Sequence, residues 1–188
     1  STVPVHISAR RFSEALSLLH RTNSFMNGKM KIAAQQISEV VLLNLLRTSP
    51  DLSESDTTVV IHAERENARV LVLQGRELLH PGNLIRCEGT PEERYELIYR
   101  RLLLEIDLIN GPRIDHVVLS GDLDKPEAVR FFTEKLNDTN VGQFQFDFLG
   151  EFPGDHVAGE TWGDYALAIG LAWQQLSEGE WQFLDGNI

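Results

Sequence analysis

The sequence has little that would cross-link the chain or place it in a membrane. Cys87 is the only cysteine among 188 residues, so an intrachain disulfide is excluded and the main sign of an oxidising compartment is missing. The longest strongly apolar run covers only residues 40–46, far short of the roughly 20 residues that a transmembrane helix needs. No signal peptide opens the chain. These absences predict a soluble protein of the cytosol.

Positive charge is also scarce. The chain has 17 Lys and Arg against 28 Asp and Glu, so its formal net charge is −11. Because nucleic acids and anionic lipids attract basic surfaces, this balance argues against nucleic-acid binding and against direct membrane binding. Hydrophobic residues make up 42% and charged residues 24% of the chain, close to the average globular domain, which excludes intrinsic disorder.

Two patterns divide the chain. Residues 1–50 predict a βαβα segment, because short β-rich stretches alternate with amphipathic helical ones. The polar stretch 51–56 is the best candidate linker, and residues 57–188 form the second region. The elements expected there are strands at 57–62, 69–73 and 76–86, a helix at 91–109, a strand at 116–119, a helix carrying Val129, Phe132 and Leu136, a loop at 137–142, a strand at 144–148 and a closing helix.

The order from residue 57 onward is therefore βββαβαβα. Pro81-Gly82 breaks the third strand, and Thr90, Pro91 and Glu93 form the expected start of the long helix, as cap, first helical residue and capping-box partner. Three antiparallel strands extended by two parallel ones predict an α/β fold with a mixed five-stranded sheet and helices on its faces.

Candidate site residues lie where strands end. The turn Ser120-Gly121-Asp122 follows a buried strand, and ligands of open α/β sheets bind beyond the carboxyl ends of such strands. A tight strand-to-helix turn, in which a glycine is needed for its backbone dihedrals, is the simpler interpretation. His62-Ala63-Glu64 matches the His-x-Glu of zinc deaminases, but that chemistry needs a cysteine pair that the chain lacks; a solvated hairpin loop between the first two strands is the simpler interpretation.

No constellation typical of catalysis or metal binding appears. Asp122, Asp124 and Asp155, with His116 and His156, match no zinc or EF-hand spacing, so no metal site is expected. A P-loop and a nucleophile elbow are missing as well. The sequence therefore does not predict an enzyme.

The element order, the turn at Ser120-Gly121-Asp122 and the closing helix 165–172, which reads YALAIGLA, together resemble the second lobe of the actin-like (ribonuclease H-like) ATPase fold. The likeness is greatest to the PilM/GspL type, cytoplasmic proteins of type IV pilus and type II secretion assembly platforms. Residues 32–46 resemble the crossing from the first lobe into the second. The resemblance divides the chain into the end of the first lobe, 1–50, and an actin-like second lobe, 57–188.

The resemblance also implies a nucleotide site, at His62, Glu64, Ser120, Gly121 and Asp122. The chain departs from the family pattern there, because His62-Ala63-Glu64 replaces an Asp-Ile-Gly-type phosphate loop and Gly121-Asp122 replaces the adenosine-contacting Gly-Gly. A glutamate beside a phosphate would repel it, and the first-lobe phosphate loop is absent. The chain thus resembles a carboxy-terminal or truncated piece of a larger protein with a degenerate site. No cofactor is expected for this chain, although ATP and Mg²⁺ would suit the full-length protein.

Two functions follow from the resemblance. The first is a non-catalytic scaffold that binds protein partners of a pilus or type II secretion platform, as a possible homodimer peripheral to the inner membrane. The second is one lobe of an actin-like-fold ATPase or of a sugar- or acetate-type kinase. Site evidence favours the scaffold, because phosphoryl transfer needs positioned phosphate and metal ligands. An unrelated small α/β protein remains a third alternative.

Overall fold

The structure, a computed structural model, describes residues 38–47, 53–144 and 166–170. All of these residues belong to one compact unit of the chain. Of the expected elements, those before residue 38, most of the closing helix and positions 145–148 of the last strand lie outside the described residues. The elements in chain order are α2 (Ser38–Arg47), β1 (Thr57–Glu64), β2 (Asn67–Gln74), β3 (Glu77–His80), β4 (Leu84–Arg86), α3 (Pro91–Leu108), β5 (His116–Gly121), α4 (Pro126–Lys135) and β6 (Asn140–Gln143).

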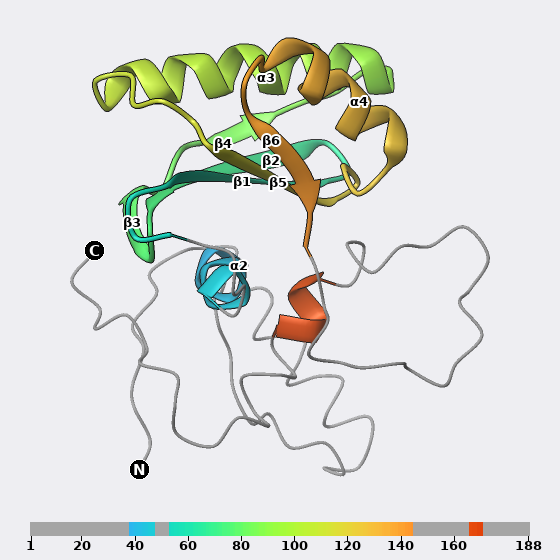
Figure 1. Ribbon diagram of the computed structural model, residues 1–188. Helices are drawn as coiled ribbons and strands as arrows, with labels where there is room; N and C mark the ends of the chain where they lie inside the picture. The colour runs from blue at the N-terminus through green and yellow to red at the C-terminus, as the bar shows by residue number, and fades with distance from the viewer. Residues whose placement is uncertain (1–37, 48–52, 145–165, 171–188) are drawn as a thin grey trace, which may run out of the picture. The chain divides into compact units, whose positions relative to one another are not determined.

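The strands form one mixed sheet in the order β3-β2-β1-β5-β6 (Figure 1). β1 lies at its centre, antiparallel to β2 and parallel to β5, and β6 extends the sheet parallel to β5. The antiparallel part thus precedes the parallel part, as the element order predicted. The mixed α/β sheet is confirmed.

The expected third strand is two strands, so the described residues form a sheet of six strands where five were expected. Pro81 and Gly82 separate β3 from β4, and both strands pair with β2. Proline cannot donate to a strand ladder. Gly82 has φ +60°, and a Cβ there would lie 1.9 Å from the carbonyl oxygen of Val70. The strand therefore breaks at Pro81-Gly82, where the chain passes close to the backbone of β2.

The last strand begins earlier than expected. The sequence predicted a loop at 137–142 and a strand at 144–148, but β6 occupies Asn140–Gln143 and Phe144 lies beyond its end. The loop prediction was wrong because polar residues and a glycine have low strand preference. These residues nevertheless form a strand because their backbone pairs with β5, with Val117 opposite Val141 and Val118 opposite Gly142.

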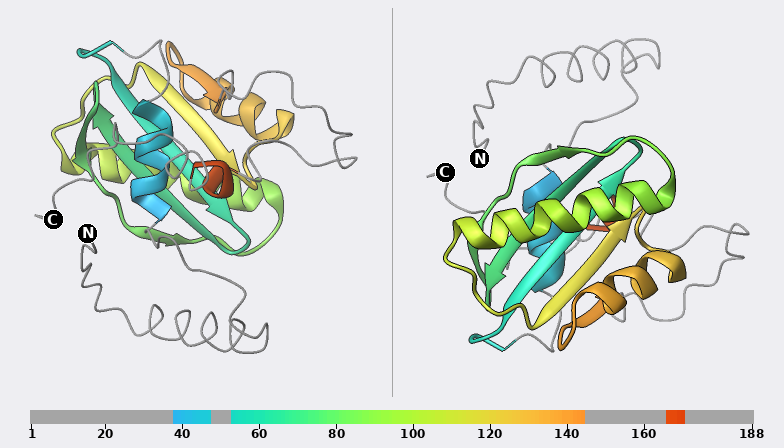
Figure 2. Two further views of the ribbon diagram at one scale, coloured as in Figure 1. Left: turned by 90° about the horizontal axis from the view of Figure 1, so that it is seen from below. Right: turned by 90° about the horizontal axis from the view of Figure 1, so that it is seen from above.

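Two apolar clusters cover the two faces of the sheet. On one face, inward residues of α3 and α4 such as Ile98, Leu102 and Phe132 pack on alternate strand residues such as Ile61 and Leu119. Figure 2 shows α3 and α4 together on this side.

The other face is covered by α2. Leu42, Leu43 and Leu46 pack on Val60 and Leu71, and burial of each such leucine contributes about 1.5–3 kcal/mol. Segment 166–170 is helical and also lies against α2: a Cβ at Gly170 would meet Val41 Cγ1 at 2.5 Å. Gly170, which has no side chain, therefore permits this segment to pack closely against α2.

Candidate functional site

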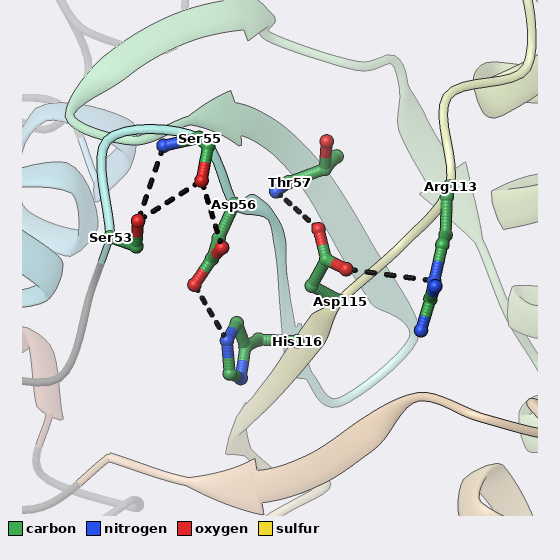
Figure 3. Close-up of polar contacts among 7 residues, drawn as sticks. All are labelled: Ser53, Ser55, Asp56, Thr57, Arg113, Asp115 and His116. Atoms are coloured by element: carbon green, nitrogen blue, oxygen red, sulfur yellow. Dashed lines mark hydrogen bonds and ion pairs between the residues drawn. The ribbon is translucent and has the colours of Figure 1, made fainter.

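A polar cluster at the amino ends of β1 and β5 sets the register of these parallel strands (Figure 3). Thr57 N–H donates to Asp115 Oδ2 at 2.9 Å, and Asp115 N–H donates to the Thr57 carbonyl at 2.9 Å. His116 Nε2 lies 3.2 Å from Asp56 Oδ2, and Arg113 Nε lies 3.6 Å from Asp115 Oδ1. With the strand starts joined in this way, His62 lies beside Ser120 at the carboxyl ends.

His62 and Ser120 form a buried pair. His62 Nδ1 and Ser120 Oγ are 3.1 Å apart, and the two residues are 8% and 0% exposed. Both belong to the face of the sheet that α2 covers, since their neighbours Ala63 and Leu119 face the α3 side. Ser120 is thus enclosed and has a partner of its own, which leaves its hydroxyl little access to a ligand.

The second ring nitrogen of His62 is less well matched. His62 Nε2 lies 3.2 Å from Glu64 Oε1 but has no hydrogen bond of good geometry within the described part of the chain. The Glu64 side chain is 64% exposed, so water screens this contact and it contributes little. His62 and Ala63 lie inside β1, and the hairpin turn consists of Arg65 and Glu66 alone. The prediction of a solvated loop at His62 was therefore wrong.

Gly121 is required by the protein's own backbone. Its φ is +67°, and a Cβ there would lie 2.2 Å from the carbonyl oxygen of Ala63. The next amide, Asp122 N–H, donates to that same carbonyl at 2.8 Å. The conformational freedom of this glycine therefore lets the turn after β5 close over the end of β1, and the amide that could have met a phosphate is already used.

Asp122 faces a cation that the sequence did not associate with this turn. Arg94 Nη2 on α3 donates to Asp122 Oδ2 at 3.1 Å. Burial would lower the pKa of Arg94, but the Asp122 carboxylate and the Cys87 thiol raise it, and the net direction is upward. Arg94 therefore stays charged and ties α3 to the turn. Its position, 28 residues before Asp122, gave no local signal that could have linked the two.

The structure brings the five predicted nucleotide-site residues to one edge of the sheet. Ser120 and Asp122 are held by the protein's own side chains, and Gly121 by its backbone. Only Glu64 presents an exposed charged group, and it is an anion.

Metal-binding groups do not gather here. In the part of the chain that the structure describes, no three His, Cys, Asp or Glu side chains lie together as a metal site would require. His116 is bound to Asp56 at the amino end of β5, whereas Asp122 follows its carboxyl end. A hollow of about 510 Å³ lies near the starts of β5 and β6, lined by residues such as Tyr99, Ile114 and Thr139, and so does not adjoin the predicted site.

A second buried polar cluster lies between α3 and the β3–β4 edge. Glu105 is 4% exposed; its Oε2 lies 2.5 Å from His80 Nε2 and its Oε1 accepts from Asn83 Nδ2 at 3.0 Å. Burial would raise the pKa of Glu105, but the hydrogen bonds from His80 and Asn83 outweigh it and lower the pKa. The cluster joins α3 to the antiparallel edge of the sheet.

Known proteins resemble the chain in structure but not in sequence. No protein-family model matches it, and no curated protein matches it by sequence. A chain of the PilM–PilN type IV pilus biogenesis complex superposes with a TM-score of 0.61 at 12% identity, covering 84% of this chain and 57% of that one. A Bacteroides thetaiotaomicron protein with an actin-like ATPase fold and unknown function gives a TM-score of 0.45 at 18% identity, covering 65% of this chain and 45% of that one.

The likeness to the pilus complex, together with the mixed sheet and its covering helices, identifies the fold. The chain has an actin-like α/β fold. Its fold is similar to that of the matched chain of the PilM–PilN complex. The chain spans between 45% and 57% of the length of these two solved chains, about half of each.

Proposed function

We propose that this chain is part of a cytoplasmic scaffold protein of a pilus or type II secretion assembly platform, and that it acts by binding proteins. The observation that carries the proposal is the state of the turn after β5. Gly121 lies against the carbonyl oxygen of Ala63, and the Asp122 amide donates a hydrogen bond to that oxygen. The Ser120 hydroxyl is hydrogen-bonded to His62. A site whose backbone and hydroxyl groups already have partners within the protein has little left to offer a phosphate.

Electrostatics support the same conclusion. Glu64 and Glu66 are exposed at and just beyond the end of β1, where the family pattern would place a phosphate loop. The two carboxylates flank one exposed cation, Arg65, so the local charge is still negative and disfavours a polyanion. Arg94, which contacts the turn after β5, is already paired with Asp122. We therefore infer a degenerate nucleotide site.

The type of partner is inferred from the fold. The similar chain belongs to a complex of PilM with PilN, and we propose that this protein likewise binds a protein of an inner-membrane platform. No helix among residues 38–47, 53–144 and 166–170 is both long and apolar enough to span a bilayer. In our proposal, attachment to the inner membrane comes from that partner or from sequence beyond this chain.

Fractionation and co-purification of the full-length protein test the proposal. We expect the protein in the membrane fraction together with pilus or secretion proteins, and its release when the partner gene is deleted. The matched variant is Arg94→Ala, which disturbs the predicted nucleotide turn and leaves the outer surface intact; it should still co-purify. Recovery of a free cytosolic monomer that phosphorylates a small metabolite would establish the kinase alternative instead.

A further inference from the structure

Helix α3 is apolar on its outer side as well as on its core side. Ile98 and Leu102 are fully buried against the sheet, whereas Leu97, Leu104 and Leu108 are 38%, 53% and 70% exposed. In the view from above in Figure 2, no described element lies over α3. A helix that is apolar on two sides is expected to be covered on both.

The outer residues follow the spacing of a coiled coil. Leu97, Arg101, Leu104 and Leu108 are separated by four, three and four residues, which is the alternation of d and a positions in a heptad. A single polar residue at an a position, here Arg101, is a device that fixes register in such pairs. The residues at the g positions are then Arg100 and Asp107, which carry opposite charges.

These charges suit one arrangement of two copies. Consider two identical helices that pack antiparallel about a two-fold axis perpendicular to both. The g positions of the two helices then lie along the same side of the seam, where each g residue faces a g residue of the other copy. With the axis between Leu103 and Leu104, Arg100 of each copy faces Asp107 of the other. A parallel pair would instead set Arg100 beside position 105, and Glu105 is buried against His80.

Both charged groups are available for this contact. The Asp107 side chain has no ion pair with any residue in the described ranges. Arg100 pairs with Glu96 one turn away, at 3.0 Å, but is itself 74% exposed. Exposed pairs at this helical spacing are worth only about 0.3–0.5 kcal/mol, so Arg100 can exchange or share its partner.

We propose that two copies of this chain associate through antiparallel packing of their α3 helices. Leu97, Leu104 and Leu108 form the seam, and Arg100 and Asp107 form two symmetric ion pairs along one side of it. The contact is isologous, as a closed dimer requires. A seam of three helical turns buries less than the roughly 800 Å² per partner of a standard interface, so the dimer is reversible. This interface does not depend on the proposed scaffold function.

Sedimentation velocity of the 188-residue chain over a range of concentrations is the first test. We expect a monomer–dimer equilibrium that Leu104→Lys weakens about 100-fold or more, because two further cations would enter the seam beside the two Arg101 side chains. Leu84→Lys is the control: Leu84 is 50% exposed but lies on β4, and its substitution should leave the equilibrium unchanged. A wild-type chain that stays monomeric at millimolar concentration would overturn the proposal.

Charge exchange tests the orientation. Arg100→Glu and Asp107→Arg should each weaken self-association, because each places like charges opposite one another. An equimolar mixture of the two variants should form a heterodimer, since every g–g pair is then complementary. Circular dichroism of each variant controls for folding. A mixture no more associated than its components would rule out this pairing.

Cysteine cross-linking completes the test. Leu104→Cys lies beside the proposed axis and should form an intermolecular disulfide under oxidising conditions. Leu97→Cys should not, because its two copies are about 20 Å apart along the seam at 1.5 Å per residue. Cross-linking of both would indicate parallel helices and overturn the proposal. The proposal would also be overturned if the Leu104→Cys chain is monomeric and its new thiol does not react with maleimide. Another part of the same chain would then cover α3.

Discussion

His62 Nδ1 and Ser120 Oγ lie 3.1 Å apart and join the carboxyl ends of two strands whose residues are 58 positions apart in the sequence. The pair is buried between the sheet and its α2 side. It occupies the place where a ligand of this kind of sheet would bind. The imidazole and the hydroxyl are therefore partners of each other within the protein.

Removal of the Ser120 hydroxyl should destabilise the protein. Ser120→Ala leaves a buried imidazole nitrogen without a partner, which costs about 1–3 kcal/mol. Urea unfolding followed by circular dichroism measures the loss. Ser53→Ala, at an exposed serine, is the control and should change stability by less than about 0.5 kcal/mol.

A double substitution separates the hydrogen bond from packing. His62→Leu combined with Ser120→Ala removes both polar groups and should recover most of the stability lost by Ser120→Ala alone. If Ser120→Ala unfolds at the wild-type urea concentration, the pair contributes nothing and its assignment is wrong.

Three glycines should respond to alanine in a graded way. Gly142→Ala should be neutral or stabilising by up to about 1 kcal/mol, because no heavy atom of the described residues, its chain neighbours aside, lies within 4 Å of an added Cβ. Gly111→Ala should cost about 1–2 kcal/mol, because its φ is +61° although the space is open. Gly121→Ala adds a clash with Ala63 to a φ of +67° and should cost about 2–5 kcal/mol. Thermal unfolding of the three variants checks the order, and equal losses at Gly111 and Gly121 would contradict the close approach.

The buried Glu105 carboxylate should make stability depend on acid pH. Its pKa is lower in the folded protein than in the unfolded chain, so it stabilises the fold above the unfolded pKa of about 4.3. That contribution is lost as the pH falls through the folded pKa. Glu105→Gln should therefore be less stable than the wild type by about 1.5–3 kcal/mol at pH 5.

The same comparison at lower pH is the decisive measurement. The difference between wild type and Glu105→Gln should shrink steadily from pH 5 to pH 3, as measured by urea unfolding at each pH. Glu134→Gln is a suitable control and should show no such trend, because Glu134 is exposed and forms no ion pair with any residue in the described part of the chain. A difference that stays constant over this range would mean that the carboxylate is not held ionised by His80 and Asn83.

ATP should bind weakly and should not be hydrolysed by this chain. Calorimetric titration with ATP and Mg²⁺ should give a dissociation constant above about 1 mM, which corresponds to a binding free energy weaker than about −4.1 kcal/mol. Since the repulsion is assigned to an exposed carboxylate, Glu64→Gln should bind more tightly than the wild type. Micromolar binding of ATP by the wild type would show an intact site and favour the ATPase or kinase alternative.

Local sequence patterns were sufficient for most of the elements. The start of α3 follows from its capping box: Glu93 N–H donates to Thr90 Oγ1 at 3.3 Å, and Thr90 N–H donates to Glu93 Oε2 at 2.8 Å. The helix expected at 91–109 is α3, and Pro81-Gly82 correctly marked a break. These features depend on residues close together in the chain, whose preferences act before any tertiary contact forms.

The tertiary structure decided what depends on distant partners. β6 forms from a polar stretch because β5 offers it an open edge, a gain that no local preference reveals. His62 is buried rather than solvated because the Thr57–Asp115 bonds set the strand register, and Asp122 meets Arg94 because α3 crosses the sheet. The sequence by itself determined which elements form and which residues end the strands. Only the packing of strands and helices decided whether those residues face a ligand or each other, because backbone pairing and burial bring together groups that no local spacing connects.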